Sequence, residues 1–361
     1  MKKLALLQAS SLPPLYARWI AEASIDLPAE PLATCDSCVM LAEPEALPGA
    51  VFFDEGTKCC TYQPALPSFL VGEVLSDPAE ARSRDLLVER IAAREGVTPL
   101  GVDAPEQLRD AYLAVTRDGR FGRAPELACP HLLPGAACGI WRHRNATCAT
   151  WFCKHERGAT GARFWRRLRD LLALAEARLA RWCALEVGIG DAALASLMEI
   201  TDAAGDRVKE PRADPDRAYR ARWGPWAGRE ASFYVECAAR VDALSWPDVM
   251  RITGSDADLG LRLVRHTRDA LGKAGLSQAD QPGDPAAALW MGDTELDPSR
   301  RVVRGYSEYD PLVLPEALVE ALPRFDGRPT VEVLAELSAR GLELDEALLS
   351  ALVDFEVLVP R

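Results

Sequence analysis

The placement of ten cysteines constrains this sequence more than any other feature. Two of them, Cys183 and Cys237, stand alone on apolar helical stretches, where a buried thiol acts as a small hydrophobe. The other eight form two tight groups in the first 153 residues: Cys35, Cys38, Cys59 and Cys60, then Cys129, Cys138, Cys148 and Cys153. In a reducing compartment, thiols clustered in this way bind metal or carry out chemistry more often than they form structural disulfides. The sequence therefore predicts that these eight side chains are metal ligands or neighbours of ligands.

The spacing within the first group bears on how many centres there are. Cys35 and Cys38 form a C-x2-C pair, which lets two thiolates reach one tetrahedral ion from a tight turn. Cys59 and Cys60 are adjacent, and neighbouring side chains on an extended backbone point in opposite directions. Either one of these two is not a ligand, or the pair bridges two centres or a polynuclear cluster. Eight thiolates suffice for two four-sulfur sites, which suit zinc or an iron–sulfur cluster such as 4Fe-4S.

Basic side chains and imidazoles gather around the second group. Each of His131, His143 and His155 is either a ligand or acid–base group, or a solvated loop residue. Arginines beside a four-thiolate centre offset its negative charge and donate hydrogen bonds to sulfur. We therefore expect Arg142 and Arg144 to contact the cofactor. A solvated helix face and a site for an anionic substrate are the alternatives for this basic run.

Charge and hydropathy argue against several classes of protein. The net charge of -12 disfavours non-specific binding to nucleic acid, which needs a basic surface. The apolar run after Met1 stops at Gln8, too short for a signal sequence, and no stretch approaches the length of a membrane span. The sequence also carries no dinucleotide fingerprint, P-loop or G-x-S-x-G element. It predicts a cytoplasmic protein that binds neither nucleic acid nor membrane.

Apolar periodicity predicts a mainly α fold with small β elements, in three parts. Residues 1–160 form a loop-rich, Cys-rich metal-binding domain with helical inserts. Residues 161–280 form a helical region that begins with a long amphipathic helix over 164–182. A linker rich in Gly, Pro, Asp and Gln follows. Residues 286–361 then read as strand, three short helices and strand, which is the order of a winged helix.

The cysteine pattern resembles that of the YkgJ-type zinc- or iron-chelating proteins, which carry a CxxCxxCC element and several later cysteines. The segments that follow the second half of that pattern are Cys129-Pro-His-Leu132, Cys138-Gly-Ile-Trp141 and Arg144-Asn-Ala-Thr-Cys148. The resemblance covers residues 30–160, and it departs from the family in the long gap between Cys38 and Cys59 and in Trp141 and Asn145, where the family has Tyr and Pro. It implies a metal cofactor. Flagellin lysine methylases have a similar cysteine pattern, which raises protein modification as a function.

The C-terminal segment resembles the PqqD-type winged helices that recognise peptides in peptide-modifying systems. The similarity lies in residues 306–311, residues 325–331 and the leucine-rich helix pair up to Leu358. It implies a protein or peptide partner, with a structural or docking domain as the alternative. DNA recognition is disfavoured because the last helix, 345–354, carries acidic and no basic side chains.

Two functional hypotheses follow. The first is a redox or protein- or peptide-modifying enzyme with an iron–sulfur centre. The second is a zinc-stabilised adaptor whose winged helix binds a peptide. The sequence assigns no catalytic residue to either.

Overall fold

The computed structural model describes residues 12–30, 38–41, 51–202, 215–272 and 287–360. Of these residues 57% are helical and 9% lie in strands, which confirms a mainly α fold with small sheets. Cys35 and most of the predicted linker lie outside the described residues. Among the described helices, none combines the length and the hydropathy needed to cross a membrane.

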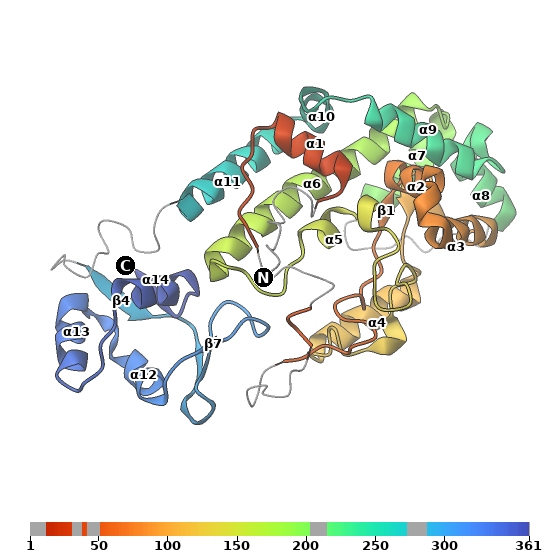
Figure 1. Ribbon diagram of the computed structural model, residues 1–361. Helices are drawn as coiled ribbons and strands as arrows, with labels where there is room; N and C mark the ends of the chain where they lie inside the picture. The colour runs from red at the N-terminus through yellow and green to blue at the C-terminus, as the bar shows by residue number, and fades with distance from the viewer. Residues whose placement is uncertain (1–11, 31–37, 42–50, 203–214, 273–286, 361) are drawn as a thin grey trace.

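A long helix, α6 (Gly158–Glu186), runs through the middle of the larger lobe (Figure 1). Its predicted apolar stripe is buried at Phe164, Leu168, Leu171, Leu172, Ala175 and Leu179. Helices from both sides of the sequence pack against it: α2 (Ser68–Ser76), α5 (Ala146–Thr150), α9 (Glu230–Asp242), α10 (Trp246–Thr253) and α11 (Ser255–Gly272). One apolar core, from Leu12 to Leu271, thus draws on both of the first two predicted parts.

The remaining elements of this lobe are short. They are α1 (Pro14–Glu22), β1 (Leu66–Pro67), η1 (Pro78–Glu80), α3 (Ala81–Ala93), β2 (Val97–Thr98), β3 (Gly101–Val102), α4 (Glu106–Arg117), η2 (Pro125–Leu127), η3 (Trp141–His143), α7 (Asp191–Asp202), α8 (Pro215–Trp223) and η4 (Gly224–Trp226). The three strands form an antiparallel sheet in the order β1-β3-β2.

Helix α2 was not expected from the sequence. Residues 68–72 and Val74 are buried in a nearly continuous run, so the segment shows no helical period. Its Gly72 allows α9 to approach closely, since a Cβ there would lie 1.9 Å from the carbonyl oxygen of Tyr234. Helices α10 and α11 are separated at Gly254, whose φ of 82° ends α10.

The C-terminal lobe has its own core, which includes Leu289, Val303 and Leu352. Its helices are α12 (Glu316–Ala321), α13 (Thr330–Ser338) and α14 (Glu346–Asp354), with η6 (Pro298–Arg300) and η7 (Leu322–Arg324). Its strands are β4 (Ala288–Met291), β5 (Glu295–Asp297), β6 (Val302–Arg304), β7 (Leu312–Val313), β8 (Asp326–Pro329) and β9 (Leu358–Pro360). They form two antiparallel sheets, β8-β4-β9 and β5-β6-β7, so the lobe has more strands than expected.

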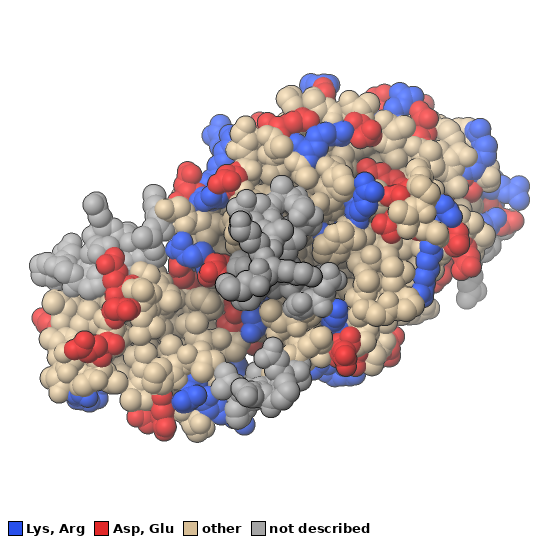
Figure 2. All heavy atoms as spheres, viewed as in Figure 1, with Lys and Arg blue, Asp and Glu red and all other residues tan. Residues whose placement is uncertain are grey.

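The C-terminal lobe joins the larger lobe where α6 begins, directly after the last of the clustered cysteines. Arg157 holds the Asp354 carboxylate through two hydrogen bonds of 2.5 and 3.1 Å. The His155 backbone amide donates to Asp310 at 3.1 Å, and the Tyr306 hydroxyl donates to the same carboxylate. On the face drawn in Figure 2, basic side chains lie beside acidic ones over both lobes.

Candidate metal centre

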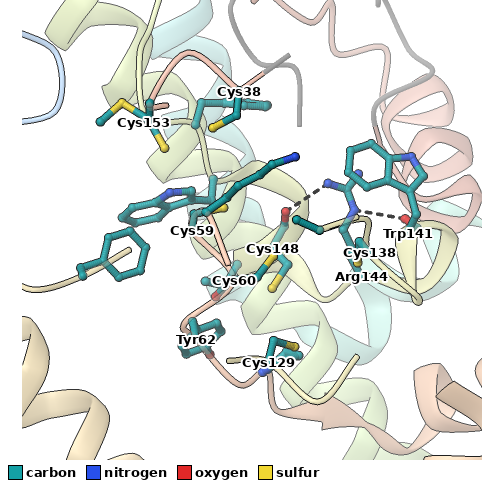
Figure 3. Close-up of a pocket in the computed structure, with 18 of the residues that line it drawn as sticks. Cys38, Cys59, Cys60, Tyr62, Cys129, Cys138, Trp141, Arg144, Cys148 and Cys153 are labelled. Carbon is teal, nitrogen blue, oxygen red and sulfur yellow. Dashed lines mark hydrogen bonds between the residues drawn. The ribbon is translucent and has the colours of Figure 1, made fainter. Parts of the chain in front are cut away.

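Seven of the eight clustered cysteines line a single cavity of about 210 Å³ (Figure 3). They are Cys38, Cys59, Cys60, Cys129, Cys138, Cys148 and Cys153. Cys35, the eighth, lies outside the described residues. Cys183 and Cys237 are buried elsewhere, between α6 and α9, with the Cys183 Sγ 3.8 Å from the carbonyl oxygen of Cys237. The fold therefore brings together the thiols that the sequence groups and packs the other two as hydrophobes.

Backbone contacts bring Cys60, Cys129, Cys138 and Cys148 to one end of the cavity. The amide of Cys129 donates to the carbonyl of Cys60 at 2.8 Å. An isolated β-bridge between Leu132 and Cys138 folds the next loop back on itself. Cys148 lies on α5, whose N-terminus is capped where Asn145 Oδ1 accepts the Cys148 amide at 2.9 Å. We call these four cysteines the inner quartet.

The thiols of the inner quartet affect one another electrostatically. Burial, and then the neighbouring Cys60 and Cys138, raise the pKa of Cys129 to about 12. Burial also raises the pKa of Cys148 well above its usual value, with Cys129, Cys138 and Cys60 adding to the effect. Four thiolates cannot all be charged here without a cation among them, because buried like charges repel.

The outer trio consists of Cys38, Cys59 and Cys153, which pack against a small apolar cluster of Met40, Phe53 and Phe121. Figure 3 shows Cys38 and Cys153 at the opposite end of the group from Cys129. Cys59 packs with this apolar cluster, while its thiol also contacts the thiol of Cys60, so the adjacent pair links the outer trio to the inner quartet. The turn before them is held by Asp54, whose carboxylate accepts the amides of Gly56 and Thr57 at 2.9 and 3.1 Å.

Aromatic rings form much of the cavity wall. Phe121 packs edge-on against Trp151 at 5.3 Å between ring centroids, and Tyr62 packs in the same way against Tyr112 at 5.3 Å. Tyr309 from the C-terminal lobe lies 5.6 Å from Phe53. These rings shield the thiols from water, which strengthens any electrostatic interaction inside.

Two cationic side chains, Lys58 and Arg144, are among the described residues that line the cavity. The Arg144 guanidinium lies 3.5 Å from the centroid of the Trp141 ring and donates to the carbonyl oxygens of Trp141 and Cys148 at 3.1 and 3.3 Å (Figure 3). The pKa of Cys60 is lowered to about 7, first by the hydrogen bond from Cys59 and then by Lys58 and Arg144, against the opposing effect of burial. Arg142, the second predicted arginine, is 59% exposed and lies 3.9 Å from Asp77 instead.

None of the three nearby histidines is among the described residues lining the cavity. His131 is buried, which together with the positive charge of Arg90 lowers its pKa to about 4. His155 lies at the junction between the lobes, with Nδ1 3.2 Å from the Tyr306 hydroxyl. His143 lies between two carboxylates, Glu73 and Asp77.

Sequence reasoning missed two features of this region. The aromatic wall includes Tyr62 and Phe121. Tyr62 closely follows Cys60 in the sequence, but Phe121 lies eight residues before Cys129 and carried no such signal. The second is a group formed by Asp77, Glu80 and His143, whose ligand atoms lie within 4.8 Å of one another. A carboxylate pair spaced i, i+3 was the visible signal for it.

No family model matches the chain, and neither the curated proteins nor the solved structures contain a significant match. The resemblance to the YkgJ-type and PqqD-type families therefore stays a prediction from the motifs.

Proposed function

We propose that this chain binds two metal centres in the cysteine-lined cavity. The inner quartet would hold one centre, and the outer trio, with Cys35 as its fourth predicted ligand, would hold the other. The observation that carries this proposal is the convergence of seven cysteines from distant loops on one cavity. Buried cysteines that merely fill space have no reason to share one cavity, whereas ligands of a metal centre must do so.

The spacing of the thiols favours iron–sulfur clusters over single zinc ions. A tetrahedral zinc with bonds of about 2.3 Å holds its sulfur ligands about 3.8 Å apart. Among the described residues, no three of the cavity's cysteines bring their Sγ atoms within 4.8 Å of one another. A polynuclear cluster spaces its thiolates more widely, because a core of iron and sulfide lies between them.

We propose further that the protein is a redox enzyme, or one that modifies a protein or peptide. An iron–sulfur centre supplies one-electron transfer when it is bound. The chain itself supplies Lys58 and Arg144 to offset the negative charge of the thiolates, and aromatic rings to exclude water. A second cavity shares Tyr62 and Tyr112 with the first, which provides a place for substrate beside the centre.

The C-terminal lobe is proposed to present that substrate as a winged helix. Its three helices and the sheet β8-β4-β9 are compatible with a winged helix, and Tyr309 from this lobe packs against Phe121, which lines the cavity. Such a lobe would hold a peptide near the metal centres.

The alternative is an adaptor stabilised by zinc, with a peptide-binding winged helix. The shielding that raises the pKa of Cys129 and Cys148 favours it, since a structural zinc site is closed and leaves no open coordination position.

Metal and acid-labile sulfide content, measured with an absorption spectrum on protein purified without oxygen, separates the two. Iron and sulfide in comparable amounts, with broad visible absorption, are expected. Colourless protein with about two zinc ions would support the adaptor instead.

A further inference from the structure

A second group of metal-binding side chains lies outside the cysteine cavity, around His143. Asp77 follows the C-terminus of α2, Glu80 ends η1, and His143 ends η3, so two distant parts of the sequence meet here. Their ligand atoms lie within 4.8 Å of one another. Among the described residues this is the one such group.

The imidazole of His143 is oriented as in metal sites. Its Nδ1 lies 2.8 Å from Glu73 Oε2 on one side, and its Nε2 lies 3.0 Å from Asp77 Oδ2 on the other. A histidine that binds a metal commonly donates its other ring N–H to a carboxylate, which fixes the ring and its tautomer. Glu73 would have that positioning role, and Nε2 would face the ion together with Asp77 and Glu80.

The charge of the group also calls for a cation. Three carboxylates surround one imidazole, and the side chains of Glu73 and Asp77 are only 17% and 14% exposed. Arg142 is a weak partner, since it lies 3.9 Å from Asp77 and is 59% exposed. A protonated His143 satisfies Glu73 and Asp77 through its two hydrogen bonds, whereas Glu80 makes none to the ring and accepts the backbone amide of Arg142.

We infer that Asp77, Glu80 and His143 bind a divalent cation such as Mn²⁺ or Fe²⁺, at a site separate from the cysteine centres. Two carboxylates and one imidazole are ligands that these ions accept, whereas the thiolates of the cavity suit softer metals. The 3.0 Å between His143 Nε2 and Asp77 Oδ2 also fits neighbouring ligands on one ion, which lie roughly 3 Å apart for bonds of about 2.1 Å.

This site and the cysteine cavity share the short helix η3. Trp141 and Arg144, on either side of His143, line the cavity. A cation held by His143 would therefore fix the segment from which Arg144 reaches the backbone of Cys148.

The test is a titration of the purified full-length protein with Mn²⁺ alone, followed by the electron paramagnetic resonance signal of free Mn²⁺. The informative variant is Glu80→Gln. An ion triad of Glu73, His143 and Asp77 does not need Glu80, whereas a cation site does. Glu89→Gln, an exposed carboxyl on the neighbouring α3, is the matched control.

We expect the wild-type protein and Glu89→Gln to bind one Mn²⁺ with the same affinity, and Glu80→Gln to bind it at least tenfold more weakly. Equal binding by all three proteins, or no binding by the wild type, would overturn the inference. The thermal midpoint without Mn²⁺ and the iron and sulfide content are measured on the same samples. They report on folding and on the cysteine centres, so a failure of either proposal is distinguishable from a failure of the other.

Discussion

The backbone amide of Cys129 donates a 2.8 Å hydrogen bond to the carbonyl oxygen of Cys60. This contact ties the two cysteine groups of the sequence together at the backbone, before any metal is considered. It makes Cys60 a member of the inner quartet, although its neighbour Cys59 packs with the outer trio. The adjacent pair therefore lies between the two proposed centres.

The pair Cys59 and Cys60 gives a direct test of how the ligands divide. Cys60→Ser should remove the centre of the inner quartet, and Cys59→Ser the centre of the outer trio, because Cys60 is tied to Cys129 whereas Cys59 packs with the outer apolar cluster. Each variant is expected to retain about half of the wild-type iron and sulfide, as two equal four-cysteine sites require. Cys183→Ala, which removes a buried thiol that does not line the cavity, should leave both contents unchanged. Identical spectra for the two serine variants would contradict the division.

Arg144 and Arg142 are expected to differ in their effect on reduction potential. Reduction adds negative charge to the centre, and Arg144 lines the cavity whereas Arg142 does not. Removing the positive charge in Arg144→Gln should lower the potential by roughly 60 mV, equivalent to a tenfold change for one electron. Arg142→Gln should leave it unchanged. A redox titration followed by visible absorption measures both, and an equal shift in the two variants would rule out the local role of Arg144.

Glu176 should make stability depend on pH. This fully buried carboxyl accepts hydrogen bonds from the Tyr16 hydroxyl and, at 2.7 Å, from the Ala146 amide, and burial raises its pKa from 4.5 to about 7. A raised pKa means that the folded state holds the proton longer than the unfolded state, so stability falls as pH rises from about 4.5 to 7. Glu176→Gln keeps an acceptor but cannot ionise.

The expected gain for Glu176→Gln is therefore largest at pH 8, on the order of 1–3 kcal/mol, and smaller at pH 6. Chemical denaturation at the two pH values measures it. A gain that does not change with pH would show that Glu176 is not the titrating group.

The junction between the lobes should depend on Arg157. Its partner Asp354 is 9% exposed, so Arg157→Ala leaves a poorly solvated carboxylate without its two hydrogen bonds. We expect a loss of roughly 2–4 kcal/mol in the free energy of unfolding. Arg167→Ala is the control, because its ion pair with Asp170 is half exposed and should contribute less than about 0.5 kcal/mol. Similar losses in both variants would indicate that the contact is not specific.

Helices could be predicted from the sequence where polar residues on one face reveal the helical repeat of the apolar residues. The stripe of α6 is visible in the sequence because Arg and Asp residues alternate with Leu and Ala at helical spacing. Helix α2 carries no such signal, since its residues 68–72 are all buried in one continuous run. Its position against α9 depends on Gly72, and nothing local in the sequence indicates which helix will pack there.

The sequence indicated which cysteines belong to the candidate site, but not how the folded chain arranges them. Clustered thiols indicate metal ligands. The adjacency of Cys59 and Cys60 predicts that their side chains point in different directions. The loop that contains Cys129 meets Cys60 through a backbone hydrogen bond. Because nearly every residue carries the same backbone donor and acceptor, the sequence does not show which loop will make this contact. The aromatic wall combines Tyr62, Phe121 and Trp151 from distant segments, so it exists only after the chain has folded.

The packing of Tyr309 against Phe53 and Phe121 has a consequence for the order of assembly. Translation delivers the cysteines well before Tyr309, and N-terminal regions generally fold first during synthesis. A nascent chain would thus leave Phe121, a residue of the cavity wall, uncovered until the C-terminal lobe emerges. Under the proposed function, metal would be delivered most easily within that interval, and the completed lobe would then help to retain it.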